Sequence, residues 1–283
     1  MKGIYFLFLC SFVFIFSAEA KKIKLYKNIA YELPSVKGFD PTAHTLDIYA
    51  PVDTTEKKEV LVFIHGGSWN SGKKETYRFF GKGFAKKGQV VVIINYRLLP
   101  KAIYTGMAMD CASAVKWVYE NIDRYGGDKN KIFISGHSAG GHLAALISTD
   151  HKYFDSLKCK DPVKGIILID AFGLDIYSYL KHGYPNDETF RFTFTRNAEQ
   201  WKKASPLYSI KPSSARVILF RGGRTYPAII TDAANFHEAE LKAGNSSQLV
   251  DVKKKKHIGM IIQFFNRRNP LYARIIDFMK LKE

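Results

Sequence analysis

The sequence predicts an α/β fold with a mostly parallel central sheet and helices on both faces. Two observations predict this fold. From Leu46 onward, apolar runs of strand length alternate with helical stretches, and this is the pattern of strand–helix–strand units. Several runs are apolar at every position, as strands covered on both faces are. The 283 residues are enough for one large domain.

The predicted elements follow one another in order along the chain. Val60–Ile64 and Val90–Ile94 are continuous apolar strands, and residues 76–87 between them form a helix that ends at Gly88. Apolar residues spaced three or four apart predict a helix over 107–122. The later predicted strands are Lys131–Ser135, Gly165–Asp170, Arg216–Arg221 and Gln248–Val252. The later predicted helices are Ala139–Thr149, Ile229–Ala243 and those after Met260.

Residues 1–20 have the pattern of a secretory signal peptide. Lys2 is followed by an apolar run from Ile4 to Phe16, and Ala18-Glu19-Ala20 fits a cleavage site. The run is too short to span a bilayer comfortably, and no later run reaches that length. We therefore expect a domain of residues 21–283 that is secreted or periplasmic and makes no stable membrane insertion.

Charge and cysteine content restrict the partners that we expect. The formal net charge is +17, but no nucleic-acid motif accompanies the lysines, so we expect no nucleic-acid partner. The dense run Lys253–Lys256 is predicted to be a solvated loop. No Cys/His spacing fits a metal site, and we expect neither metal nor cofactor. Export would permit a disulfide between Cys111 and Cys159, although Cys111 falls on the apolar face of a predicted helix. The oligomeric state has no signature in the sequence.

Two glycine-containing strings follow predicted strands. The second, Gly136-His137-Ser138-Ala139-Gly140, opens into a helix and places Ser138 on a tight turn as a nucleophile. The first, His65-Gly66-Gly67-Ser68-Trp69, offers backbone N–H groups of Gly66 or Gly67. Together with the N–H of Ala139 these would bind a developing oxyanion.

His257 is the predicted general base. It follows the last predicted strand and lies C-terminal to every other part of the site, as the order serine, acid, histidine requires. A serine hydroxyl is a weak nucleophile until such a base accepts its proton. His137 and His142 lie beside the nucleophile and are expected to pack or to line the pocket.

The chain resembles an α/β-hydrolase of the esterase/lipase group with an HGGxW oxyanion loop, which includes arylformamidases and small carbohydrate or feruloyl esterases. The stretches that carry the resemblance are Leu46–Tyr49, His65–Trp69, Asn95–Leu98, Gly136–Gly141, Ala204–Pro206 and His257. The resemblance implies an α/β-hydrolase fold that cleaves a small-molecule ester through Ser138. Export favours an environmental ester such as an acylated carbohydrate.

The acid of the triad departs from the family pattern. Relatives carry Asp or Glu after the strand matched by Arg216–Arg221, where this chain has Thr225. Asp170, which ends the preceding strand, is the first substitute, and Asp175 is the second, unless it caps a helix. Asp232 falls within a predicted helix. Without any carboxylate the chain would be a weak or inactive binding protein on a hydrolase scaffold, and arylformamidase or peptidase activity is a further alternative.

Residues 172–215 interrupt the alternation of strands and helices. The stretch is long and aromatic, and Phe190–Phe194 alternates with period two. Long insertions in compact domains are often lids. We expect a short cap over the pocket, the alternative being a surface excursion packed by its own aromatic residues.

Overall fold

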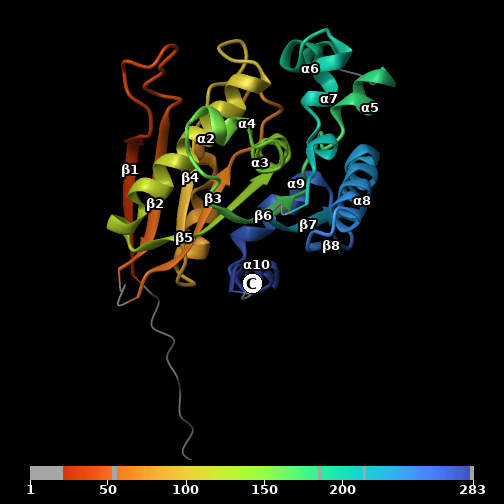
Figure 1. Ribbon diagram of the computed structural model, residues 1–283. Helices are drawn as coiled ribbons and strands as arrows, with labels where there is room; N and C mark the ends of the chain where they lie inside the picture. The colour runs from red at the N-terminus through yellow and green to blue at the C-terminus, as the bar shows by residue number, and fades with distance from the viewer. Residues whose placement is uncertain (1–21, 53–55, 184–186, 213–214, 281–283) are drawn as a thin grey trace, which may run out of the picture.

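The computed structural model describes residues 22–52, 56–183, 187–212 and 215–280. Within these residues the chain forms an eight-stranded sheet in the order β1-β2-β4-β3-β5-β6-β7-β8 (Figure 1). The strands are β1 (Ile23–Ala30), β2 (Thr45–Pro51), β3 (Lys58–Ile64), β4 (Val90–Ile94), β5 (Gly127–His137), β6 (Val163–Ile169), β7 (Arg216–Gly222) and β8 (Ser247–Val252). The predicted signal peptide lies outside the described residues.

The sheet is mostly parallel, as predicted. Only β2 runs against its neighbours, pairing antiparallel with β1 and with β4. The pairs from β4 through β3 and onward to β8 are parallel. Parallel strands bring their carboxyl ends to one edge, where sites in open α/β sheets form. The loops that follow β3, β5, β6, β7 and β8 therefore share that edge.

Helices cover both faces of the sheet. The longer ones are α1 (Arg78–Ala85), α2 (Tyr104–Asn121), α3 (Ala139–Thr149), α8 (Pro227–Lys242) and α10 (Leu271–Lys280). In β3, Val60, Val62 and Ile64 pack with the core beneath α2, α3 and α8. The alternate residues Leu61 and Phe63 pack with α1 and α10 on the opposite face. Each residue from Val60 to Ile64 thus packs in one core or the other, which explains why this stretch of the strand is apolar throughout.

The remaining helices are short. They are α4 (Lys152–Ser156), α5 (Ile176–Lys181), α6 (Asp187–Phe194), α7 (Ala198–Lys203) and α9 (His257–Ile262), with the 3-10 turns η1 (Lys74–Tyr77), η2 (Ile122–Tyr125), η3 (Pro206–Ser209) and η4 (Gln263–Phe265). Figure 1 shows α5, α6 and α7 gathered at one end of the molecule, far from α10. No helix among the described residues is both long and apolar enough to cross a membrane.

The structure differs from the sequence-based assignment in several places, and it adds β2 and the short helices α4, α5 and α7 to the predicted elements. β1 was not predicted, because its half-exposed residues carry no continuous apolar run. β5 is longer than Lys131–Ser135, since its first residues are an exposed polar extension. The period-two residues Phe190–Phe194 belong to helix α6 rather than to a strand. Cys111 and Cys159 are both free thiols.

A buried ion cluster joins the loop that follows β4 to α2. The carboxylate of Asp110 accepts hydrogen bonds from the backbone N–H of Arg97 (3.0 Å) and from its Nε and Nη2 atoms (2.9 and 2.6 Å). His44 Nε2 lies 3.2 Å from the same carboxylate. Burial by itself raises the pKa of Asp110, but the hydrogen bonds from His44 and Arg97 outweigh it and the pKa is lowered. The cluster therefore stabilises the fold at neutral pH, and this stabilisation is lost as the pH falls through the lowered pKa.

Replacing Asp110→Ala should lower the free energy of unfolding by about 3 kcal/mol, because it leaves the Arg97 guanidinium half-buried without its partner. Urea unfolding at neutral pH measures this change. The exposed ion pair between Glu238 and Lys242 supplies the matched control, since Glu238→Ala should leave the midpoint almost unchanged. Similar losses in both variants would contradict a special role for the buried cluster.

Candidate active site

The turn after β5 holds Ser138 in a strained conformation. Its φ of 55° and ψ of −123° lie outside the regions that L-residues favour, as is typical of a nucleophile on a strand-to-helix turn. A Cβ at Gly136 would stand 2.2 Å from Gly140, and one at Gly140 would stand 2.1 Å from the carbonyl oxygen of Ile64. Glycine is therefore required on both sides of Ser138.

Parallel pairing brings Ser138 beside Asp170. His137 of β5 is paired with Ile169 of β6, and Ile169 is paired with Phe220 of β7. The residues that follow, Ser138 and Asp170, therefore leave adjacent strands at the same edge. Asp170 also has a positive φ of 49°, a conformation that costs of order 1–3 kcal/mol in a non-glycine residue and is often retained at functional sites.

Ser138, His257 and Asp170 form a continuous hydrogen-bonded relay. The Ser138 hydroxyl lies 2.9 Å from Nε2 of His257, and Nδ1 of His257 lies 2.7 Å from Oδ2 of Asp170. The serine thus donates to Nε2, while the Nδ1–H donates to the carboxylate and fixes the imidazole tautomer. The structure brings together the three residues that the sequence analysis named as nucleophile, base and first substitute acid.

The carboxylate of Asp170 is fully buried and is held from two further directions. The backbone N–H of Gly222 donates to Oδ1 (2.7 Å), and the hydroxyl of Thr225 donates to Oδ2. Gly222 ends β7 and Thr225 lies in the turn that follows, which closes with a hydrogen bond from Thr225 N–H to the Gly222 carbonyl (3.2 Å). Thr225, at the position where relatives carry the acid, thus binds the acid that stands on the neighbouring strand.

The two other candidate acids lie away from the relay. Asp175 caps α5 by accepting from the N–H of Ser178 (3.0 Å), which is the alternative that the sequence analysis gave for it. Asp232 is buried within α8 and accepts from the backbone N–H of Asp175 (3.2 Å). Burial raises the pKa of Asp232 to about 7. Among the described residues neither of these carboxylates contacts His257, and Asp170 is the carboxylate hydrogen-bonded to it.

A second histidine, His137, packs against the imidazole of His257. The two rings stack with centroids 4.7 Å apart, and Nε2 of His137 lies 3.3 Å from the backbone oxygen of His257. Burial, reinforced by the neighbouring His257, lowers the pKa of His137 to about 3. His137 is therefore uncharged at neutral pH and donates its Nε2–H to that oxygen, so it adds no positive charge beside the base.

The loop after β3 distinguishes between the two glycines predicted to bind an oxyanion. The N–H of Gly66 donates to the Tyr77 hydroxyl (3.2 Å), which leaves Gly67 as the glycine of the two whose N–H has no such partner in the described part of the chain. Gly67 and Ser68 line the cavity above Ser138. No described group accepts a hydrogen bond from the N–H of Gly67, Ser68 or Ala139. Among the described residues, Ser68 thus offers a further unpaired N–H at this cavity, one that the sequence analysis did not name.

A buried histidine fixes Trp69 at the end of this loop. Trp69 donates its indole N–H to Nδ1 of His142 (3.3 Å), and Nε2 of His142 is 2.7 Å from the carbonyl oxygen of Ala204. Burial lowers the pKa of His142 to about 4, so the ring is neutral and donates its Nε2–H to Ala204. His142 thereby connects the oxyanion loop to the 172–215 segment.

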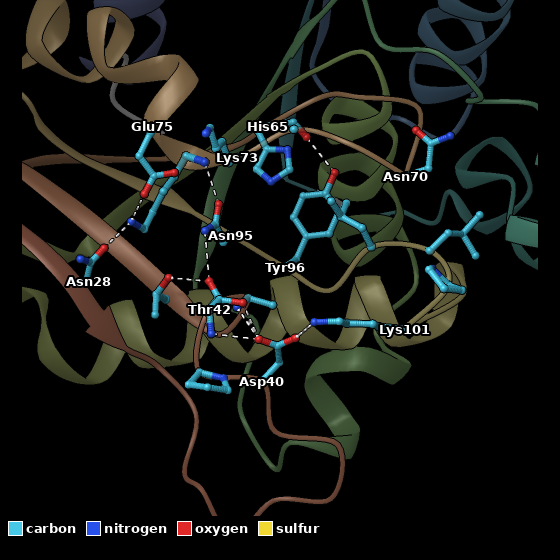
Figure 2. Close-up of a pocket in the computed structure, with 18 residues that line it drawn as sticks. Asn28, Asp40, Thr42, His65, Asn70, Lys73, Glu75, Asn95, Tyr96 and Lys101 are labelled. Carbon is cyan, nitrogen blue, oxygen red and sulfur yellow. Dashed lines mark hydrogen bonds and ion pairs between the residues drawn. The ribbon is translucent and has the colours of Figure 1, made fainter.

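The far side of the same loop borders a second cavity of about 680 Å³ (Figure 2). Here Lys74 is buried, and its ammonium contacts Asn28 (2.6 Å), Glu75 (2.6 Å) and Asp47 (3.0 Å). Asn95 accepts from the backbone N–H of Lys74 (2.7 Å). These contacts connect the loop to β1, to β2 and to Asn95, which directly follows β4. A loop held in this way presents its N–H groups in a fixed geometry.

The catalytic cavity has a volume of about 530 Å³, within the usual range for small-molecule sites. Most of the side chains that line it besides Ser138 and His257 are aromatic or apolar. Phe172, Tyr179 and Phe190 come from the 172–215 segment, and the Phe190 ring meets Trp69 edge-on at 5.6 Å. This segment therefore supplies one wall of the cavity, where the cap was expected.

Comparison with known proteins identifies a family and several relatives of this chain. A family model described as BD-FAE matches residues 46–238. A probable isoprenylcysteine alpha-carbonyl methylesterase of Oryza sativa subsp. japonica is 26% identical over 274 residues, which cover 91% of this chain and 64% of that protein. Esterase LipC of Mycobacterium tuberculosis is 28% identical over 227 residues, which cover 75% and 55% of the two chains. The chain thus spans about half to two thirds of the length of these curated relatives.

A solved structure of similar shape is a truncated carbohydrate esterase from gut microbiota. It matches with a TM-score of 0.77 at 20% identity and covers 93% of this chain and 97% of that one. Esterase B from Lactobacillus Rhamnosis matches with a TM-score of 0.75 at 17% identity, covering 92% and 87%. At these identities the likeness concerns the fold, and it confirms the predicted α/β-hydrolase fold.

Thr225→Val should lower kcat for ester hydrolysis about 10-fold, because Asp170 loses one of its hydrogen-bond donors. Thr225→Ser keeps a hydroxyl and should stay within about threefold of wild type. Steady-state kinetics on a soluble aryl ester measures both variants. Equal rates for Thr225→Val and wild type would show that the hydroxyl does not support the acid.

Proposed function

The chain belongs to the BD-FAE family, and we propose from this premise that it is an exported serine hydrolase that cleaves carboxylic esters through an acyl-enzyme on Ser138. The observation that carries the proposal is the relay from Ser138 Oγ through His257 to the buried Asp170. Relatives named as esterases support the reaction class. The export part rests on the pattern of residues 1–20.

The first half of the reaction forms the acyl-enzyme. His257 Nε2 accepts the Ser138 proton as Oγ attacks the ester carbonyl carbon, and the carbonyl becomes a tetrahedral oxyanion. Asp170 stabilises the imidazolium that forms, since its carboxylate accepts the Nδ1–H bond (2.7 Å). The same proton then passes from Nε2 to the leaving alkoxide, which departs as the alcohol and leaves the acyl group on Oγ.

The second half repeats this chemistry with water. His257 takes a proton from water, the hydroxide attacks the acyl carbon, and the proton returns to Oγ as the carboxylic acid leaves. In both halves the negative charge on oxygen would be bound by the N–H groups of Gly67, Ser68 and Ala139. The N-terminus of α3, which starts at Ala139, adds the favourable end of its dipole.

The lining of the cavity indicates which part of the substrate it takes. Trp69, Phe172, Phe190 and Ile258 form apolar walls around Ser138, so the cavity suits a short or medium acyl chain or an aryl group. We propose that the acyl part of the ester enters here. An acylated carbohydrate is the substrate we propose on the ground of export, and the carbohydrate esterase among the solved structures is in keeping with it.

The alternative of an inactive binding protein was based on the missing acid at Thr225. Thr225 instead donates to Asp170, and His257 has a carboxylate partner at 2.7 Å. Thr225 at the usual position of the acid therefore does not leave His257 without a carboxylate, and it gives no support to an inactive binding protein.

Hydrolysis of p-nitrophenyl acetate and butyrate tests the proposal. Ser138→Ala should lower kcat by at least about 10³-fold, because no other group supplies the nucleophile. Ser148→Ala is the matched control, since Ser148 is a buried serine on the same helix, and it should keep wild-type activity. The proposal fails if purified wild-type protein and Ser138→Ala hydrolyse these esters at the same rate.

A further inference from the structure

The segment after β8 has apolar residues on both of its sides. One side, in α9 and η4, is buried: Met260, Ile261 and Phe264. The other side is open to solvent, with Ile258, Ile262 and Phe265 exposed by 58, 49 and 63%. Positions spaced by four and then three residues lie on one face of a helix, so these three side chains form a row. A row of exposed apolar side chains is typical of a contact surface.

This row begins at the mouth of the catalytic cavity. Ile258 lines the cavity together with Tyr226, whose ring lies 5.1 Å from that of His257. Tyr226 is itself 55% exposed. Farther out, the Phe265 ring stacks on Phe79 at 3.9 Å. The opening through which a substrate reaches Ser138 is therefore edged by apolar surface.

Basic residues flank the row at both ends. Lys253–Lys256 precede α9, and Arg267 and Arg268 follow η4. The N–H of Arg224 donates to the Lys255 carbonyl (2.9 Å), which brings a further guanidinium-bearing residue to this side. Within the described part of the chain, none of these basic side chains has an ion-pair partner. Asp251, the acid that precedes the lysines, is paired with Arg221.

Apolar side chains bordered by unpaired cations fit one kind of partner best. A bilayer that contains anionic lipid offers hydrocarbon to the apolar row and negative headgroups to the basic flanks. A nucleic acid would match the charge but not the apolar row. A second copy of the chain on a twofold axis would set the basic flanks of both copies against each other.

We propose that the face formed by Ile258, Ile262 and Phe265 with its basic flanks docks the protein on an anionic lipid surface. The mouth of the catalytic cavity then faces the membrane, and esters held at that surface reach Ser138 without passing through bulk water. Docking on lipid does not depend on the proposed ester hydrolysis. The choice of membrane-held esters as substrates does rest on that proposed hydrolysis.

Co-sedimentation with vesicles tests the docking. The protein is expressed without residues 1–20, so that their apolar run does not itself bind lipid; every described strand and helix lies beyond them. Vesicles of phosphatidylcholine alone are compared with vesicles of phosphatidylcholine and phosphatidylglycerol. Wild-type protein should sediment with the anionic vesicles only, and added salt should weaken the binding.

Two double variants separate the apolar and the charged contributions. Ile262→Ser/Phe265→Ser should weaken binding to anionic vesicles about 10-fold or more, and Arg267→Glu/Arg268→Glu should do the same. Neither pair lines the catalytic cavity, so hydrolysis of a soluble aryl ester should be unchanged. The matched controls replace exposed residues elsewhere: Leu33→Ser/Leu241→Ser and Lys27→Glu/Lys37→Glu should bind as wild type does.

Three results would overturn the proposal. The first is absence of binding by wild-type protein. The second is equal binding by wild type and Ile262→Ser/Phe265→Ser. The third is a wild-type dimer in solution that this variant converts to a monomer, with no vesicle binding by either. Thermal unfolding verifies the folding of each variant, so the result on docking stands even if no ester is hydrolysed.

Discussion

The site depends on the buried carboxylate of Asp170. A carboxylate removed from water is costly unless hydrogen bonds replace its hydration, and here three donors do so. They are the N–H of Gly222, the Thr225 hydroxyl and the imidazole of His257. These groups come from β7, from the turn after it and from the start of α9. The orientation of His257 toward Ser138 is therefore a consequence of how the strands are paired. The strained backbone at Asp170 and Ser138 holds their side chains in the positions from which they contact His257.

The sequence predicted those features that depend on local pattern. The turn at Ser138 could be predicted from its flanking glycines, at which the structure leaves no room for a side chain. The inner strands could be predicted from apolar runs, because these strands are buried on both faces. His257 was found from its order along the chain. Asp170 remained one of several candidates, because its selection depends on the register of β6 against β5 and β7, which no local pattern encodes. The roles of Tyr77 and Thr225 likewise depend on contacts between distant segments, and β1 has too little apolar character to stand out.

The same short segment serves the chemistry and the surface of the molecule. His257 begins α9, and the exposed row that includes Ile258 follows directly. The first residue of that row, Ile258, is thus the direct chain neighbour of His257. The opposite wall of the cavity, from the 172–215 segment, is linked to the oxyanion loop through Trp69, His142 and Ala204. Both walls of the cavity are in this way connected to the groups that would act on the ester.

Reaction with a fluorophosphonate probe, followed by mass spectrometry of the labelled peptide, tests the central claim most directly. The account predicts one adduct, on Ser138, because that hydroxyl alone is paired with His257 Nε2. It also predicts that Asp170→Asn labels about 10³-fold more slowly, since asparagine does not hold the imidazole in the required tautomer. An adduct on another residue, or equal labelling rates for Asp170→Asn and wild type, would contradict the account.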